Sequence, residues 1–409
     1  MKKLFAFSLA VVLLCAAAMI PAGAAAPPAP LKFKLSDGSF KIIHVPDLQE
    51  TIWSSAVTKE FLYDLAKAEQ PDLFVLGGDN IGSGGLDKIP FFGKRLQQGG
   101  VDSFMNVFDK IYRDFDIPVT MVYGNHDNEA FNTTSRAESF AIYAAHESFI
   151  GAGAYVPEAD EGTSDAQGQH YGTHRLPIYD SAGESPVFNL WMFDSGSYDV
   201  RGGYSQVQKP QLDWFKKENG AAGKLPSFAF QHIVVPEIYD LLPAAASAGD
   251  DAFSWTFVNE QGEEFQKHIL RELPPDVKGT LREAPCPTRY NSGQLDILDG
   301  AGNVLAIFFG HDHTNTFELK RGDGPDLINT QCTGFGSYGD IDLRGVRVVT
   351  LQENDLTKYD TKLVTYQNFY PRSALRDSRL RMYQALGTFG NIVDTFSFRP
   401  LLWITGRFA

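Results

Sequence analysis

Residues Val304–His313 have the sequence VLAIFFGHDH, in which six apolar residues run directly into Gly310, His311, Asp312 and His313. A short apolar run with β-branched and aromatic side chains is typical of a buried strand. Imidazole and carboxylate groups are common metal ligands, so the tetrapeptide after this strand is a candidate metal-binding turn. Taken alone, it is equally consistent with a plain turn that carries two surface histidines.

Four further fragments decide between these interpretations, because each follows a short apolar run in the same way. They are Asp47-Leu48-Gln49 after Lys41–Val45, Gly78-Asp79-Asn80 after Asp72–Leu76, Gly124-Asn125-His126-Asp127 after Pro118–Tyr123, and Gln231-His232 after Ser227–Phe230. Parallel strands of α/β folds place their ligands at the carboxyl ends, along one edge of the sheet. The series therefore predicts one site assembled from strand ends, which is typical of a hydrolytic metalloenzyme.

Apolar residues at helical spacing predict helices between and after these strands. The helices are expected over Ser54–Ala68, Val101–Phe115, Ser135–Glu147 and Gln211–Glu218, with further strands over Val187–Phe193 and Arg344–Leu351. Strands that alternate with helices at this spacing predict an α/β fold with parallel strands buried by helices.

One long segment, Pro236–Gly293, shows no clear strand, and Asp251–Arg271 within it is expected to be partly helical. We interpret residues 236–293 as an insertion over the site rather than a separate domain.

The N-terminus has the pattern of a secretory signal peptide, predicted over residues 1–26. Lys2 and Lys3 precede an apolar run, and Ala24-Ala25-Ala26 fits an A-x-A cleavage site. Retention as a membrane anchor is the alternative, but the apolar run is short for a span and Pro21 follows it. Cleavage implies a secreted or periplasmic protein, and no other segment is expected to span a membrane.

The remaining chain divides into a linker at 27–31, a main domain at 32–370 and an apolar tail at 371–409, which we expect to pack on the domain. The chain is 43% hydrophobic and 21% charged, which is typical of a globular protein with a sizeable core. Its formal net charge of −14 argues against nucleic-acid binding. Cys286 and Cys332 could form a disulfide or remain free thiols, and neither has the CxxC spacing of a zinc ribbon.

The series D-x-Q, GDN, GNHD, QH and GHDH resembles the calcineurin-like metallophosphoesterase superfamily, whose usual series is D-x-H, GDxx, GNH[DE], a lone His and GHxH. The resemblance runs from about Lys41 to Leu351. It is most similar to a small non-purple branch with D-x-Q in place of D-x-H. The resemblance implies a four-layer α/β/β/α sandwich of two mixed sheets flanked by helices.

The resemblance also implies two metal ions, which the mixture of ligand types suggests are Mn, Fe or Zn. Asp47, Gln49 and His313 would hold the first metal, Asp79 would bridge, and Asn125, His232 and His311 would complete the second. His126 is similar to the family's catalytic histidine and would assist the leaving group, with Asp127 orienting it.

Two positions depart from the family pattern. Gln49 replaces the usual histidine, which should weaken the first metal site, and it is also consistent with a bystander that hydrogen-bonds a metal-bound water. Gly82 stands where purple acid phosphatases have a tyrosine ligand and Ser/Thr protein phosphatases have an aspartate. The remaining histidines have simpler interpretations: His44 packs in a strand, His146 and His268 lie on helices, and His170 and His174 flank a loop from which they could approach a substrate.

The expected function is extracytoplasmic hydrolysis of a phosphate monoester, by a hydroxide held between the metals, on a small phosphorylated substrate. A phosphodiesterase acting on nucleotide or lipid-headgroup diesters is the first alternative, because residues 236–293 could roof the site. The second is a non-catalytic metal-binding surface protein. Gln49 favours the non-catalytic alternative, whereas retention of His126 favours an enzyme.

Overall fold

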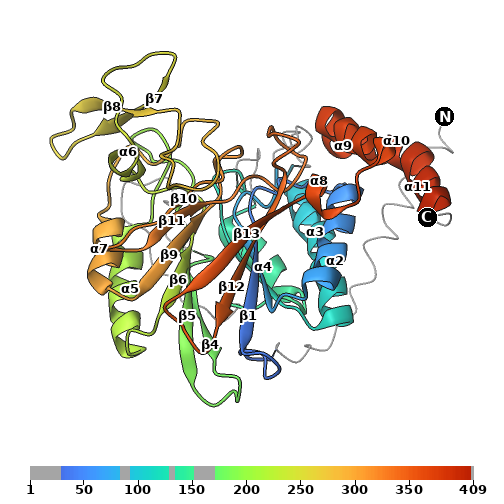
Figure 1. The fold of residues 1–409 in the computed structure, drawn as a ribbon, viewed down its shortest axis with the longest axis horizontal. Coiled ribbons are helices and arrows are strands. Elements are labelled where there is room, and N and C mark those ends of the chain that lie inside the picture. The colour runs from blue at the N-terminus through green and yellow to red at the C-terminus, as the bar shows by residue number, and fades with distance from the viewer. Residues whose placement is uncertain (1–28, 83–92, 129–133, 152–170, 407–409) are drawn as a thin grey trace, which may run out of the picture.

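Two mixed β-sheets form the middle of the fold in this computed structural model (Figure 1), which describes residues 29–82, 93–128, 134–151 and 171–406. The first sheet has the order β13-β12-β1-β2-β3. Its strands are β1 (Ser39–Val45), β2 (Leu73–Gly77), β3 (Val119–Val122), β12 (Gly345–Gln352) and β13 (Tyr359–Thr365). β1, β2 and β3 are parallel, whereas β12 is antiparallel to both β1 and β13.

The second sheet has the order β10-β11-β9-β6-β5-β4. Its strands are β4 (His174–Tyr179), β5 (Pro186–Met192), β6 (Ser227–Phe230), β9 (Val304–Phe309), β10 (Glu318–Leu319) and β11 (Asp326–Asn329). The four central strands are parallel and the two edge strands, β4 and β10, are antiparallel to their neighbours. The ligand-bearing fragments all follow parallel strands, so they emerge at the carboxyl ends of the two sheets.

The two sheets pack face to face, and alternation along each strand assigns side chains to the layers. Phe228 and Phe230 of β6 lie in the cluster between the sheets, whereas Ala229 belongs to the cluster under the outer helices. In β1, Ile42 lies between the sheets and Ile43 lies under the helices of the first sheet. Both faces of each sheet are therefore buried, which explains the nearly continuous apolar runs in the sequence.

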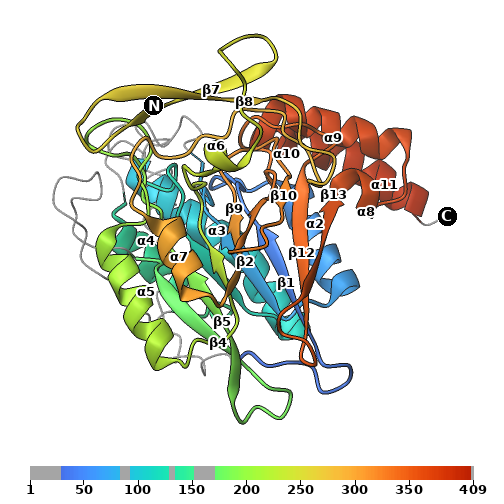
Figure 2. The same ribbon diagram turned by 60° about the vertical axis from the view of Figure 1, so that its left-hand side comes forward.

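Helices cover the outer face of each sheet (Figure 2). α2 (Ala56–Glu69), α3 (Gly93–Phe115) and α4 (Arg136–Ala145) contribute buried aromatic side chains to the cluster over the first sheet. Over the second sheet, α5 (Lys209–Ala221) and α6 (Ile238–Leu241) contribute buried aromatic side chains, and α7 (Gln294–Ala301) contributes Leu295 and Leu298. The predicted four-layer α/β/β/α sandwich is confirmed, and so are the helices and strands predicted within it.

The expectation of a partly helical segment at Asp251–Arg271 is wrong. The structure has a β-hairpin there, formed by β7 (Ala252–Val258) and β8 (Glu264–Leu270), with Phe257 paired to Phe265. Phe253, Trp255 and Phe257 recur at every second position, which is the strand period, and Gly262 takes a left-handed conformation in the turn (φ 83°). His268 accordingly lies on a strand rather than a helix, within 2.7 Å of the Ser254 hydroxyl.

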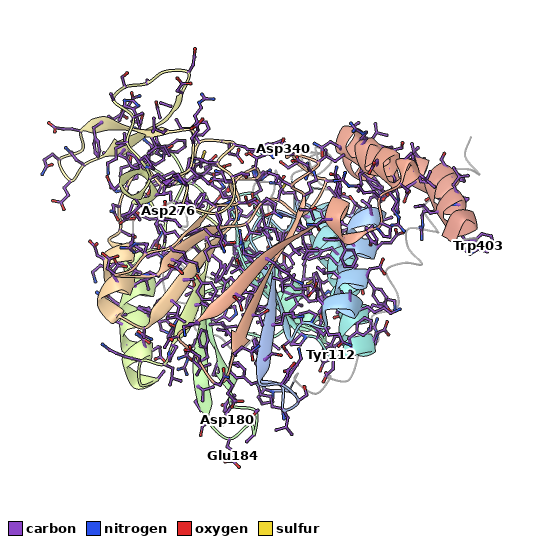
Figure 3. The ribbon with its side chains drawn as sticks, viewed as in Figure 1. Tyr112, Asp180, Glu184, Asp276, Asp340 and Trp403 are labelled. Carbon is purple, nitrogen blue, oxygen red and sulfur yellow. The ribbon has the colours of Figure 1, made fainter. Side chains whose placement is uncertain are left out.

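The hairpin stands above the carboxyl edge of the sheets in both views (Figures 1 and 2). In Figure 3, Asp340, which lies between β11 and β12, is at the same end of the molecule as the hairpin. Asp180 and Glu184, in the β4–β5 turn, are at the opposite end. The extent of residues 236–293 as an insertion remains a prediction, but a strand pair from within it overhangs the edge where the ligand-bearing turns lie.

The C-terminal segment contains α8 (Tyr366–Phe369), α9 (Ala374–Leu386), α10 (Gly390–Val393) and α11 (Arg399–Gly406). Arg379 on α9 forms ion pairs with Asp394 and with Glu60 of α2, and the Asn391 side chain accepts a hydrogen bond from the Ala56 amide. The segment therefore contacts α2, although its boundary with the main domain remains a prediction. Trp403 lies at the far end of α11 from the sheets (Figure 3).

Residues 1–26 and His170 lie outside the described residues, so the predicted signal peptide and the role of His170 stay predictions. Within the described ranges, every helix is too short or too polar to cross a bilayer. Cys286 and Cys332 are free thiols, which bears out the second of the two alternatives for this pair.

His174 is a core residue at the start of β4 rather than a group that approaches a substrate. Its Nδ1 lies 3.1 Å from the Gly172 carbonyl oxygen and its Nε2 lies 2.8 Å from the Thr120 hydroxyl, and burial lowers the pKa of His174 to about 4. The folded state therefore keeps this imidazole neutral while the unfolded chain protonates it below about pH 6.5.

This difference predicts that His174 lowers the free energy of unfolding as the pH falls from about 6.5 to 4, by roughly 3 kcal/mol in total. Above pH 6.5 the group is neutral in both states and contributes no pH dependence. Urea unfolding of wild type and His174→Gln at pH 7 and pH 4.5 measures the effect, because glutamine does not titrate. An equal loss of stability in both proteins would show that His174 does not contribute.

Candidate metal centre

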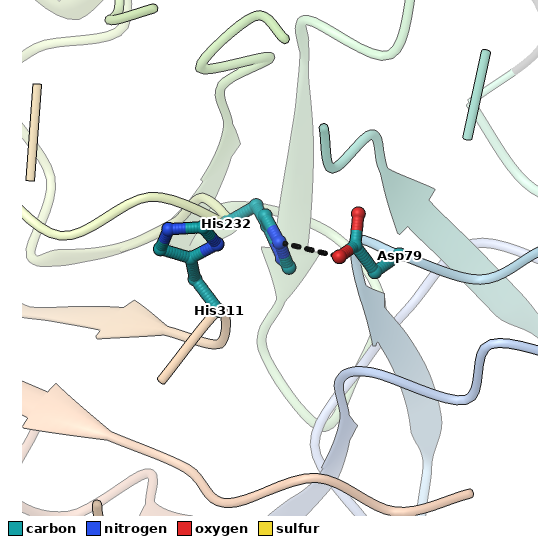
Figure 4. A group of neighbouring side chains, drawn as sticks. All are labelled: Asp79, His232 and His311. Atoms are coloured by element: carbon teal, nitrogen blue, oxygen red, sulfur yellow. Dashed lines mark ion pairs between the residues drawn. The ribbon is translucent and has the colours of Figure 1, made fainter. Parts of the chain in front are cut away.

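Five polar turns that are far apart in the chain meet at the carboxyl edge of the sheets. The candidate ligand atoms of Asp79, His232 and His311 lie within 4.8 Å of one another, and so do those of Asp47, Asp79 and His313. Figure 4 shows the first of these groups, with the ring of His232 directed at the carboxylate of Asp79. Asp79 belongs to both groups, which is the position that the family resemblance predicts for a bridging carboxylate.

The distances within the two groups are short, but their geometry is not that of hydrogen bonds. His232 Nε2 lies 3.2 Å from Asp79 Oδ2, and His313 Nε2 lies 3.2 Å from Asp47 Oδ1. Nevertheless, His232 Nε2 and Asp47 Oδ1 are buried without a hydrogen-bond partner among the described residues. The Nε2 of His311 and the Oδ1 of Asn125 are also buried without a hydrogen-bond partner among the described residues.

Buried polar atoms without partners are costly and rare, so a cluster of them requires an explanation. Here all four atoms belong to side chains that the sequence predicts as ligands, and they are the nitrogen and oxygen donors that Mn, Fe or Zn accept. The donor set and its unpartnered atoms therefore fit a dinuclear metal centre.

Backbone carbonyl groups fix the orientation of two of the histidines. The Nδ1 of His232 lies 2.9 Å from the Gly77 carbonyl oxygen, and the Nδ1 of His313 lies 2.8 Å from that of Tyr338. Because a carbonyl oxygen only accepts, each Nδ1 must carry the proton, which leaves Nε2 as the lone-pair atom when the ring is neutral. Such contacts hold a metal-binding imidazole in the required tautomer.

The charges of the centre shift its pKa values strongly. Burial opposes protonation of His232, but Asp79 and Asp47 outweigh it and raise the pKa of His232 to about 10. Burial likewise opposes ionisation of Asp79, yet His232 and His126 hold the pKa of that carboxyl below its usual range. Burial and the neighbouring His232 lower the pKa of His311 well below normal. The carboxylates thus attract positive charge into the centre, which a metal ion would supply in place of a proton.

The backbone at the ligands is strained. Asp47, Gln49, Asp79 and His311 all adopt left-handed φ angles, between 43° and 70°. A non-glycine residue rarely takes this conformation, and it costs roughly 1–3 kcal/mol each time. Four of the positive-φ residues are predicted ligands, so tight turns at the strand ends direct these side chains toward one another.

Two glycines allow the turns to approach each other. A Cβ atom at position 124 would lie 2.2 Å from Asp79 Oδ1, and one at position 310 would lie 2.8 Å from Asp47 Oδ2. Gly124 of GNHD and Gly310 of GHDH therefore have no room for a side chain, because each lies against the carboxylate of another motif.

The two departures from the family pattern, Gln49 and Gly82, are neighbours in space. A Cβ at position 82 would lie 2.6 Å from the Gln49 carbonyl oxygen, so neither a tyrosine nor an aspartate has room there. Gly336 approaches the same carbonyl from its own loop, where a Cβ would lie 1.8 Å away. The Gln49 side chain donates to Asp79 Oδ2 over 3.3 Å, which places it beside the first group of ligands.

His126 and Asp127 lie in different surroundings. The His126 side chain is 34% exposed, and its Nε2 lies 3.8 Å from Asp79 Oδ2, so it stands at the opening of the centre. The buried Asp127 carboxylate accepts hydrogen bonds from the backbone amides of Asn80, Ile81 and Gly124 at 2.8–3.0 Å. Asp127 thus joins two of the ligand-bearing turns, and its role in orienting His126 remains a prediction.

Sequence reasoning missed three aromatic residues beside the ligands. The Asn125 amide donates to the Tyr198 hydroxyl over 3.2 Å, which leaves its Oδ1 directed to the centre. Tyr204 packs against the ring of His311 and Tyr338 stacks on that of His313, at centroid distances of 4.4 and 4.2 Å. No spacing in the sequence connects these tyrosines to the motifs; only Gly334–Gly339, which contains Tyr338, is conspicuous for its glycines.

The chain is similar to several known proteins. The chain is 26% identical to "Probable inactive purple acid phosphatase 28" of Arabidopsis thaliana, over 71% of this chain and 69% of that protein. It is 25% identical to "Probable inactive purple acid phosphatase 29" of the same plant, over 87% and 86%. A dimetal phosphatase from Danio rerio is similar in structure, with 15% identity, a TM-score of 0.44, and coverage of 80% of this chain and 99% of that one.

The family described as calcineurin-like phosphoesterase matches residues 40–315, which is about two thirds of the chain. This range contains the motifs from Asp47 to His313 and the parallel strands that precede them, whereas β10–β13 follow it. The resemblance to the superfamily is thus confirmed, whereas the non-purple branch remains a prediction, because the plant relatives are named as purple acid phosphatases. The chain belongs to the calcineurin-like phosphoesterase family.

Proposed function

We propose that this protein hydrolyses phosphate monoesters outside the cytoplasm, with two metal ions drawn from Mn, Fe and Zn. The family is one of metal-dependent phosphoesterases. The observation that carries the proposal is the shared carboxylate of Asp79, which lies within 4.8 Å of ligand atoms from both groups of donors. The unpartnered buried atoms of Asp47, His232 and His311 support it.

Each residue has a distinct part in this proposal. Asp47, Asp79 and His313, with Gln49 beside them, would hold one metal, and Asp79, Asn125, His232 and His311 would hold the other. When bound, such a pair neutralises phosphoryl oxygens and provides a nucleophile from water at neutral pH. His126 would donate a proton to the leaving oxygen, because its partly exposed ring stands at the opening and is not one of the grouped ligands.

The test is turnover of an aryl phosphate monoester and a matched diester by the chain, first after chelation and then with Mn, Fe or Zn restored. Metal-dependent hydrolysis with the monoester preferred is the expected result. Preference for the diester would favour the alternative in which the β7–β8 hairpin selects a nucleotide or lipid-headgroup diester. No turnover with any metal, in a protein that still binds metal, would overturn the proposal.

A non-catalytic, metal-binding surface protein is the second candidate. The two plant relatives carry "probable inactive" in their names, and Gln49 occupies the position where the family usually has a histidine. His126 argues against this candidate, because a pure binding protein has no use for a proton donor at the mouth of the centre. Bound metal without turnover distinguishes it from the enzyme.

Gln49→His is expected to tighten the first metal site by about tenfold, because a neutral imidazole nitrogen is a better ligand than an amide oxygen for these metals. Titration of the chelated protein with Zn, against a competing chromophoric chelator, measures both affinities in one experiment. The second site is the internal control and should keep its affinity. Equal affinities in the variant and the wild type would make Gln49 a bystander rather than a ligand.

A further inference from the structure

Three aromatic rings lead away from the candidate metal centre toward the β7–β8 hairpin. The ring of Tyr204 meets that of His311 edge to face at 4.4 Å between centroids. Tyr198 stacks on Tyr204 at 5.7 Å with an angle of 26°, and Tyr204 lies nearly parallel to Trp255, at 6.3 Å and 7°. We call Tyr198, Tyr204 and Trp255 the aromatic wall.

The wall is built from two separate elements and is anchored to the centre. Tyr198 and Tyr204 form an antiparallel bridge in the segment between β5 and α5, whereas Trp255 comes from β7 of the hairpin. The Tyr198 hydroxyl accepts a hydrogen bond from the Asn125 amide, so the wall contacts a predicted ligand of the second metal at that end as well. The wall therefore begins at the place where the phosphoryl group of a substrate would lie.

The loop that carries the two tyrosines is held in place. Asp199 pairs with Arg201 through two hydrogen bonds of 2.6 and 2.8 Å, and the Arg201 guanidinium lies 3.8 Å from the ring centroid of Tyr290. The Tyr290 hydroxyl in turn donates to the Arg201 carbonyl oxygen over 3.0 Å. A wall fixed in this way loses little conformational entropy when a ligand packs against it.

The wall is more exposed than the aromatic clusters of the core. Tyr198 is 37% exposed, and Tyr204 and Trp255 are only partly buried, although Tyr198 and Tyr204 contact predicted ligands. The indole Nε1 of Trp255 is buried without a hydrogen-bond partner among the described residues. Trp255 also packs against the cluster over the second sheet, and its ring bridges that cluster and Tyr204 beside the centre.

We propose that the aromatic wall receives a planar aromatic group carried by the leaving group of the phosphate ester, as in a nucleoside monophosphate. This inference rests on the proposed function and specifies its substrate class. With the phosphoryl group between the ligands, the organic part of the ester extends past His311 along the wall. Flat rings stack on tyrosine and tryptophan independently of their exact hydrogen-bonding pattern, so the wall selects for aromaticity.

The test compares substrates with the same kind of leaving oxygen. Adenosine 5′-monophosphate and ribose 5-phosphate both release a primary alkoxide and differ in the base, as 2-phenylethyl phosphate and ethyl phosphate differ in a phenyl ring. The ratio of kcat/KM within each pair isolates the contribution of the ring from the chemistry of the phosphate. We expect a ratio of about 10 or more in the wild type for the nucleotide pair.

Substitutions in the aromatic wall test whether the preference for an aromatic leaving group depends on these rings. Trp255→Leu should lower the ratio about tenfold, whereas Trp255→Phe, which keeps a ring, should retain most of it. Phe265→Ala is the matched control, because Phe265 lies on the same hairpin, is 41% exposed and contacts Phe257. Circular dichroism melting of each variant verifies that the hairpin change leaves the protein folded.

The outcomes separate this inference from the proposed function. If both members of each pair are hydrolysed at equal kcat/KM, or if Trp255→Leu keeps the wild-type ratio, the wall is not a leaving-group site although the enzyme assignment stands. If no ester is hydrolysed with any metal, the proposed function fails and the inference falls with it. A preference within the nucleotide pair alone supports a nucleobase site, and a preference within both pairs supports a general aromatic site.

Discussion

His126→Ala is expected to lower kcat for a phosphate monoester with a poor leaving group at least about 100-fold, while metal content stays unchanged. The His126 ring stands at the opening of the centre, 34% exposed and 3.8 Å from the carboxylate that both ligand groups share. It lies outside those groups, so its removal should not release metal. An alkoxide leaving group requires a proton as it departs, and that is the step that the variant would lose.

The measurement is kcat on an alkyl and an aryl monoester, together with metal analysis of the same samples. The loss should be smaller for the aryl ester, because a phenolate leaves without help from an acid. His268→Ala is the control, since His268 lies on β8 and contacts Ser254. A wild-type rate in His126→Ala would remove this residue from the mechanism, and loss of metal would make it a ligand instead.

Asp79→Asn is expected to release both metals and to abolish activity, by at least about 1,000-fold. One side chain is shared by the two groups of donors, so both sites lose a charged ligand at once. The substitution preserves size, and its amide oxygen can still accept the hydrogen bond that Asp79 Oδ1 receives from the His126 amide. The loss would therefore report the missing negative charge of the shared ligand rather than a change of shape.

Metal analysis after dialysis measures the occupancy, with kcat measured in the presence of added metal. Asp109→Asn is a suitable control, because Asp109 is another buried carboxylate but pairs with His146, remote from the ligand-bearing turns. The control should retain metal. Full occupancy of two metals in Asp79→Asn would contradict the bridging assignment, and retention of one metal would show that the sites are independent.

Much of the candidate site could be predicted from the sequence because each predicted ligand lies shortly after a strand. The apolar run fixes the strand, and the position after it fixes the edge of the sheet to which the ligand is delivered. For this reason Asp47 and His311 were expected together although 264 positions separate them, and the structure joins them by a hydrogen bond of 3.0 Å from the His311 amide to Asp47 Oδ2.

The β7–β8 hairpin was predicted incorrectly for a related reason. Its strands do not lie in the main sheets, and β8 is largely exposed and polar, so no continuous apolar run marked it. Phe253, Trp255 and Phe257 occupy every second position, and this alternation is the pattern that predicts a strand.

The sequence by itself determined the α/β class and the order of the strands that precede the predicted ligands, because these depend on local patterns, namely the period of apolar residues and the polar residue after each strand. The family and the four-layer sandwich followed from the resemblance of the motif series. Only the tertiary structure decided that Gly82 packs on the Gln49 carbonyl, that Asp127 joins two turns through their amides, and that the ring of Tyr204 contacts those of His311 and Trp255. Those contacts join segments that have no shared spacing in the chain, and they form because packing of the two sheets brings the ends of their strands to one edge.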